Sequence, residues 1–164
     1  MDKITLGTRK VSIEFPGVKA LSDVDFEIST GMIHAVMGAN GAGKSTLMKV
    51  LAGSNPDYTG DVLYNGNVVE LRNPAAAKKL GIQIVYQEVD MALIPTLTVA
   101  ENVMFNDLVM NMGHKQFVNY GKIRKDAKEA LARLNVNIDV RRMCGTLTLA
   151  QKQMVLIARA VQSA

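Results

Sequence analysis

Alternating apolar and polar residues make the first third of the chain β-rich. Residues 11–15 (VSIEF) and 24–28 (VDFEI) alternate in the way half-buried strands do. Pro16 and Gly17 separate them through a short linking stretch. Residues 61–71 read as a hairpin whose two-residue turn is Asn65 and Gly66, because both tolerate the positive φ of a type I′ turn. These segments predict a small, half-buried antiparallel sheet.

Two further segments are more uniformly apolar. Residues 32–37 (MIHAVM) and 82–86 (IQIVY) have the pattern of strands covered on both faces, as in a parallel sheet. His34 lies inside the first of them and is expected in the core. A helix is predicted between them from Gly43 to Ala52, and a second one over residues 74–80.

The pattern becomes helical after residue 87. Residues 98–106 have helical spacing, residues 149–162 form a last helix, and residues 110–120 are loop-like. Thr148 and Gln151 fit a capping box at the start of the last helix. A further amphipathic helix is predicted from five apolar positions on one face: Ile123, Ala127, Ala130, Leu131 and Leu134.

Composition narrows the class of protein. The 164 residues are 48% apolar and carry a net charge of +4, which excludes general disorder and does not favour a nucleic-acid binder. A single cysteine, Cys144, excludes an internal disulfide framework and is expected to be buried. The N-terminus is not a signal peptide and no apolar run is long enough to span a bilayer, so we expect an intracellular, soluble α/β chain.

One motif carries most of the functional information. Residues 38–46 (GANGAGKST) match G-x-x-x-x-G-K-[ST], after an apolar segment and before a helix, as a P-loop requires. The glycines allow a tight turn whose N–H groups face phosphate oxygens, and the helix N-terminus adds positive potential. Lys44 is expected on the β- and γ-phosphates, the Ser45 hydroxyl on Mg²⁺ and Thr46 on the α-phosphate. The predicted ATP-binding loop is therefore Gly38, Ala39, Asn40, Gly41, Ala42, Gly43, Lys44, Ser45 and Thr46.

The sequence argues against two other classes of nucleotide-binding site. The dinucleotide fingerprint G-x-G-x-x-G is absent from the loop, which excludes a Rossmann site. The guanine-reading motif Asn-Lys-x-Asp is also absent. Residues 57–60 (DYTG) match D-x-x-G, but they sit in a turn with no apolar strand before them, so the match is interpreted as a coincidence.

Several segments in register resemble the ATP-binding cassette (ABC) family, specifically the ATPase subunits of bacterial sugar importers of the ribose, galactose and xylose type. The resemblance extends over nearly the whole chain. Its segments are residues 15–21 (FPGVKAL), 33–38 (IHAVMG), 86–88 (YQE), 97–102 (LTVAEN) and 145–151 (GTLTLAQ).

The resemblance implies roles for residues outside the P-loop. Phe15 would stack on adenine, and Gln87, in the Q-loop, would bind Mg²⁺, orient water and act with Lys44 in catalysis. The signature would be Leu147, Thr148, Leu149, Ala150 and Gln151, which contacts the ATP of a second cassette. Here Thr148 replaces the usual Ser and Leu149–Ala150 replaces Gly-Gly. Ala150 is familiar in the sugar-importer branch.

The family fold implied is α/β: a P-loop NTPase core with an antiparallel β-subdomain and a helical subdomain, incomplete at the C-terminus. Residues 1–87 would form the nucleotide-binding core with the β-subdomain, and residues 88–164 the Q-loop and helical subdomain. The chain ends before the Walker B strand and its catalytic Glu. We therefore expect the N-terminal part of the first cassette of a longer subunit, inactive alone.

The expected function is that of an ABC importer subunit, which binds Mg-ATP and couples its hydrolysis to transport of a monosaccharide. Its partners would be a second cassette and a membrane permease contacting the Gln87 region, with no nucleic acid. Its place would be the cytoplasmic face of the cell membrane. Two alternatives stay open: a nucleotide-binding module without hydrolysis, and a soluble ABC ATPase not tied to transport.

Overall fold

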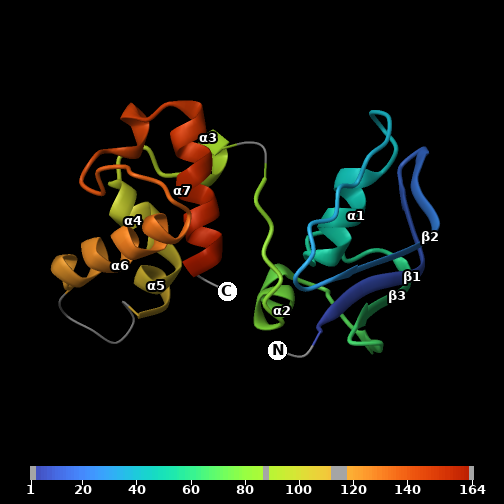
Figure 1. Cartoon of the computed structure of the whole chain (residues 1–164). Coiled ribbons are helices and arrows are strands. Elements are labelled where there is room, and N and C mark those ends of the chain that lie inside the picture. The colour runs from blue at the N-terminus through green and yellow to red at the C-terminus, as the bar shows by residue number, and fades with distance from the viewer. Residues whose placement is uncertain (1–2, 87–88, 112–117, 163–164) are drawn as a thin grey trace. The chain divides into compact units, whose positions relative to one another are not determined.

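The computed structural model describes residues 3–86, 89–111 and 118–162 of the chain. The chain divides into two units, Met1–Ile84 and Val85–Ala164. Each unit has its own apolar core, and Figure 1 labels β1, β2 and β3 and the helices α1 to α7.

An antiparallel sheet dominates the first unit. Its strands are β1 (Thr5–Phe15), β2 (Val18–Ser29), β3 (Thr59–Tyr64) and β4 (Asn67–Val69), in the order β2-β1-β3-β4. β1 and β2 are longer than the alternating segments that predicted them, because cross-strand hydrogen bonds continue through positions such as Gly7 and Thr8. The predicted antiparallel sheet is thus confirmed and more extensive than expected.

The predicted turn between β3 and β4 is confirmed in its backbone geometry. Asn65 has φ 50° and Gly66 has φ 75°, the left-handed conformations of a type I′ turn. The Asn65 side chain also accepts a hydrogen bond from the N–H of Thr5 at 2.9 Å. The turn is thereby fastened to the start of β1.

Two helices accompany the sheet, both close to their predicted bounds: α1 (Lys44–Leu51) and α2 (Pro74–Lys79). Apolar residues of α1 share one core with the inward-facing residues of the hairpin β1–β2. The contributing residues are Val11, Ile13, Leu21, Leu47, Val50 and Leu51. This core fixes the start of α1, and so the end of the P-loop, against the hairpin.

The two predicted parallel strands do not form. Residues 32–37 and 82–86 carry no strand assignment, and in the first segment Ile33 is 102% and Met37 88% exposed. A strand is held by hydrogen bonds to a neighbour along its length, and no described segment pairs with either one. His34 is exposed rather than in the core, and its Nε2 accepts a hydrogen bond from the N–H of Ser29 at 3.5 Å.

The second unit is helical. Its elements are α3 (Val89–Ala92), α4 (Val99–Val103), α5 (Phe105–Asn111), α6 (Tyr120–Arg133), the 3₁₀ turn η1 (Cys144–Thr146) and α7 (Leu149–Gln162). The expected helix over 98–106 is two helices, since α4 ends at Val103 with Met104 as its C-cap, and α5 begins directly after Met104. No helix in the described part of the chain is long and apolar enough to cross a membrane.

The core of the helical unit follows the predicted periodicity. α6 buries Ile123, Ala127, Ala130 and Leu131, four of the five predicted positions, and Leu134 is partly buried beside them. Cys144 is fully buried, as expected. Of the predicted loop over 110–120, residues 112–117 lie outside the described residues.

Candidate functional site

The glycine-rich segment 38–46 ends in the first turn of α1. Gly43 is the N-cap residue of this helix and adopts a left-handed conformation, with φ 84°, and Gly41 does the same. Among the described residues no side chain caps α1. The backbone N–H groups of its first turn are therefore not taken up by a capping side chain, which is the arrangement that binds anions at helix N-termini.

Lys44, the first residue of α1, folds back over this loop. Its Nζ donates hydrogen bonds to the carbonyl oxygens of Gly38 and Ala39, each at 2.8 Å. The loop is tightened by a hydrogen bond from the N–H of Ala42 to the carbonyl of Ala39 at 3.2 Å. An ammonium has three N–H donors, and these two bonds use two of them, so among the described residues the third can donate to an anion. Ser45 is exposed and Thr46 half-buried in the same turn.

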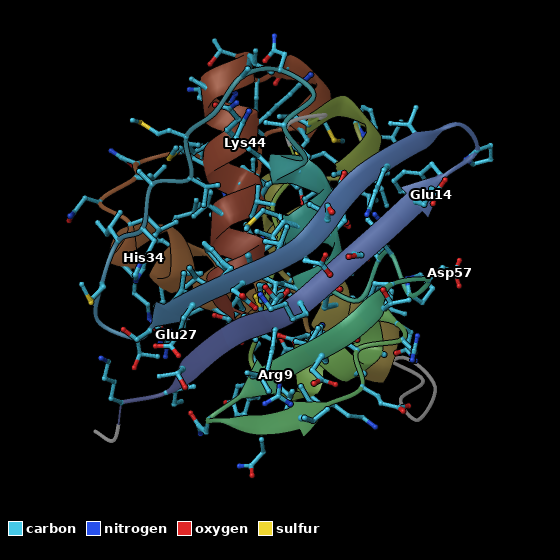
Figure 2. The ribbon with its side chains drawn as sticks, turned by 90° about the vertical axis from the view of Figure 1, so that its right-hand side faces the viewer. Arg9, Glu14, Glu27, His34, Lys44 and Asp57 are labelled. Atoms are coloured by element: carbon cyan, nitrogen blue, oxygen red, sulfur yellow. The ribbon has the colours of Figure 1, made fainter. Side chains whose placement is uncertain are left out.

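The hairpin β1–β2 lies directly against the end of the loop. A Cβ at Gly43 would stand 2.5 Å from the carbonyl oxygen of Ala20 and 2.7 Å from Cδ2 of Leu21. Figure 2 shows Glu14 near the turn of this hairpin, and Glu27 and His34 toward its open end. The close approach means that the hairpin and the loop hold a fixed relative position.

Phe15 lies at the turn of the same hairpin. It is the last residue of β1, pairs with Val18 across the turn and is 42% exposed. A half-exposed aromatic ring outside the core offers a face for stacking. The structure thus places Phe15 on the element that contacts the P-loop, and not in the core.

Gln87 lies outside the described residues, so the structure does not place it. The segment before it, residues 82–86, is irregular in place of the expected strand. The predicted Mg²⁺ pair of Ser45 and Gln87 therefore remains a prediction from the sequence.

The predicted signature segment forms the N-terminus of α7, in the helical unit. The N–H of Thr148 donates to Oε1 of Gln151 at 3.1 Å, and the N–H of Gln151 donates to Oγ1 of Thr148 at 3.3 Å. These reciprocal bonds confirm the predicted capping box. Leu147 is buried beneath it, while Thr148, Leu149 and Ala150 are exposed. The segment therefore presents a capped helix end to its surroundings.

The turn before the signature is fastened to another part of the helical unit. The N–H of Cys144 donates to the carbonyl of Leu97 and the N–H of Gly145 to that of Pro95, both at 3.0 Å. Burial raises the pKa of the Cys144 thiol above its usual range. These contacts make Cys144 a structural residue beneath the signature.

A polar pair inside the helical core was not foreseen from the sequence. Asn102 is 0% exposed, and Arg159 of α7 donates hydrogen bonds to its main-chain and side-chain oxygens. Burial lowers the pKa of the Arg159 guanidinium below its usual range. The sequence did contain a signal for this pair. Arg159 interrupts the apolar run 153–161 (QMVLIARAV), and an arginine that is buried among apolar residues needs a hydrogen-bonding partner.

The chain is similar to known proteins in sequence and in fold. The family model described as ABC transporter matches residues 21–164. The chain is 42% identical over 156 residues to "Ribose import ATP-binding protein RbsA 1" of Rubrobacter xylanophilus, covering 95% of this chain and 30% of the relative. It is 46% identical over 155 residues to "Putative ribose/galactose/methyl galactoside import ATP-binding protein 3" of Agrobacterium fabrum, covering 94% and 30%.

Solved structures give the same fold. A nucleotide-free ATP-binding cassette from an ABC transporter superposes with a TM-score of 0.79 at 25% identity, covering 98% of this chain and 65% of that one. The α/β fold of P-loop cassettes is therefore the fold of this chain. The chain spans about 30% of the length of the curated relatives that it matches.

Proposed function

Because the chain belongs to the ABC transporter family, we propose that it supplies the P-loop and signature of an ATPase subunit that drives monosaccharide import. The observation that carries the proposal is the Lys44 ammonium held over a glycine loop at the uncapped start of α1. The sugar class comes from the two relatives, whose names specify ribose and galactose import.

The loop residues Gly38, Ala39, Asn40, Gly41, Ala42, Gly43, Lys44, Ser45 and Thr46 bind the triphosphate in this proposal. Backbone N–H groups of the loop and of the first turn of α1 donate to phosphate oxygens. Lys44 adds a charge-assisted hydrogen bond, and Thr46 reaches the α-phosphate. The exposed hydroxyl of Ser45 fits a Mg²⁺ ligand, with Gln87 as the second, and the ion would neutralise charge on the phosphates.

The other predicted residues complete the proposed site. Phe15 stacks on the adenine from the hairpin that touches the loop. Leu147, Thr148, Leu149, Ala150 and Gln151 form the signature, and the helix N-terminus meets the γ-phosphate bound by a second cassette. Gln87 orients the attacking water, and its region contacts a membrane permease, so the subunit works at the cytoplasmic face of the membrane.

Hydrolysis in this proposal needs groups that these 164 residues do not supply. No Asp-Glu pair follows an apolar strand after the signature, and the run 153–161 carries no acid. A general base that polarises water is essential to this chemistry. The chain by itself is therefore proposed to bind Mg-ATP without turning it over, and the longer subunit to couple hydrolysis to transport.

A titration of the chain with fluorescent ATP and Mg²⁺ tests the proposal. Lys44→Ala should weaken binding about 10- to 100-fold, because a hydrogen bond to a charged group contributes about 1.5–3 kcal/mol. Lys49→Ala is the matched control, since Lys49 is an exposed lysine in the last turn of the same helix. Equal affinity for the wild type and Lys44→Ala would refute the phosphate assignment. Turnover above background would refute the assignment of catalysis to groups outside the chain.

A further inference from the structure

Arg159 joins three parts of the helical unit. Its Nε donates to the main-chain oxygen of Asn102 at 2.6 Å, its Nη2 to Oδ1 of Asn102 at 2.9 Å, and its Nη1 to the carbonyl of Ala92 at 2.7 Å. Its Cζ lies 5.4 Å from the centre of the Phe105 ring. A planar guanidinium holds its partners at fixed angles, which the single ammonium of a lysine does not.

The hydrogen-bond partners of Arg159 belong to one segment, residues 92–102, which has hydrogen bonds of its own. Ala92 ends α3 and Asn102 lies in α4. The Asn102 side chain accepts from the N–H of Ile94 at 2.9 Å and donates to the carbonyls of Ile94, Leu97 and Thr98 at 3.0, 3.3 and 3.1 Å. Residues 92–102 are therefore held together by hydrogen bonds that converge on the Asn102 side chain.

The segment 92–102 is also hydrogen-bonded to residues just before the signature. The carbonyls of Pro95 and Leu97 accept from the N–H groups of Gly145 and Cys144, two and three residues before Leu147. Arg159 binds the same segment from the last turn of α7, beyond the signature. The signature is thus attached to residues 92–102 at both ends, by main-chain bonds before it and by a guanidinium after it.

We infer that Arg159 is a positioning residue for the signature segment Leu147–Gln151, fixing the direction of α7 so that its exposed N-terminus moves together with residues 92–102. The inference rests on the proposed function, in which this N-terminus meets a nucleotide. A position that must be correct to within about 0.5 Å needs a supporting group of this kind.

Hydrogen–deuterium exchange of the 164-residue chain tests the inference. Exchange is measured with and without Mg-ATP for the wild type, Arg159→Lys and the matched control Arg133→Lys, which changes an exposed arginine at the end of α6. In the wild type, Mg-ATP should protect both residues 38–46 and residues 143–151. In Arg159→Lys the ATP-dependent protection of 143–151 should fall about fivefold or more, while residues 38–46 are still protected once Mg-ATP is saturating.

The outcomes separate this inference from the proposed function. Protection of 143–151 that survives in Arg159→Lys overturns the inference alone. Protection at 38–46 without protection at 143–151 in the wild type overturns the proposed role of the signature, and the inference with it. Absence of protection at 38–46 overturns the proposed function. If Arg159→Lys does not fold, Phe105→Leu removes the ring and leaves the three hydrogen bonds. It should reduce the ATP-dependent protection of 143–151 in part, and full retention there would also overturn the inference.

Discussion

Gly43 lies so close to Ala20 that there is no room between them for a side chain: a Cβ on Gly43 would stand 2.5 Å from the carbonyl oxygen of Ala20. The contact joins the N-cap of α1 to the hairpin that carries Phe15. The position of the P-loop relative to the hairpin therefore depends on a glycine, independently of any ligand.

Gly43→Ala should destabilise the chain and weaken Mg-ATP binding together. The cost combines a left-handed alanine, about 1–2 kcal/mol, with displacement of the Ala20 main chain. Gly41→Ala is the matched control, because Gly41 has the same φ of 84° but nothing within 4 Å of its Cβ position. Urea unfolding should show a larger loss for Gly43→Ala, and equal losses would mean that the hairpin contact contributes nothing.

Phe15→Ala should weaken binding of ATP by about 1–3 kcal/mol, the usual contribution of an aromatic face stacked on a base. Affinity for inorganic triphosphate should not change, because that ligand has no base. Val18→Ala is the control, as Val18 is exposed on the other side of the same turn. A parallel loss of affinity for triphosphate would show that Phe15 supports the loop instead of the adenine.

Thr148→Ala should lower the free energy of unfolding by about 1 kcal/mol, because it removes the Oγ1 acceptor of the capping box. Thr148→Ser keeps that acceptor and should restore most of the stability. Chemical unfolding followed by helical circular dichroism measures both. If alanine and serine behave alike, the hydroxyl does not cap α7 in solution.

Asn102→Ala should be the most damaging single change in the helical unit, at about 3 kcal/mol or more. It leaves donors of Arg159 and Ile94 without their acceptor in the core, and each such buried group costs about 1–3 kcal/mol. The same substitution at Asn137, which is exposed, is the control and should cost little. Similar urea midpoints for the two variants would contradict the role given to Asn102.

The buried thiol of Cys144 gives a pH dependence. Its pKa is raised by burial above the ordinary thiol value of 9.0, so the folded state disfavours the thiolate. Its contribution to stability is present in full below that ordinary value, and it is lost as pH rises from there through the raised pKa. Cys144→Ala should flatten the fall in unfolding free energy above about pH 9, and an unchanged pH profile would contradict this assignment.

Local signals predicted much of the structure. The Asn65–Gly66 turn, the bounds of α1, α2 and α7 and the Thr148–Gln151 capping box all follow from interactions within a few residues, and such interactions are legible in a sequence. The failures at residues 32–37 and 82–86 concern pairing between distant segments. An apolar run shows that a segment favours burial, but not which neighbour is available to supply its hydrogen bonds.

The Arg159–Asn102 pair shows the same limit inside the helical unit. The two residues are 57 positions apart, and neither belongs to a short motif. An arginine in an apolar run indicates that a buried partner exists, but only the fold identifies it. The P-loop differs, because its glycines, lysine and hydroxyls are contiguous and carry both their geometry and their chemistry in nine residues.

The central claim, that phosphate binds at the loop over which Lys44 lies, is tested most directly by the backbone amide signals of the chain in an ¹H–¹⁵N NMR titration with Mg-ATP. The amides of Gly41, Gly43, Lys44 and Ser45 should move downfield and saturate together, since each would gain an anionic acceptor. Inorganic triphosphate should move the same four. Saturable shifts elsewhere in the chain, with these four amides unmoved, would contradict the account.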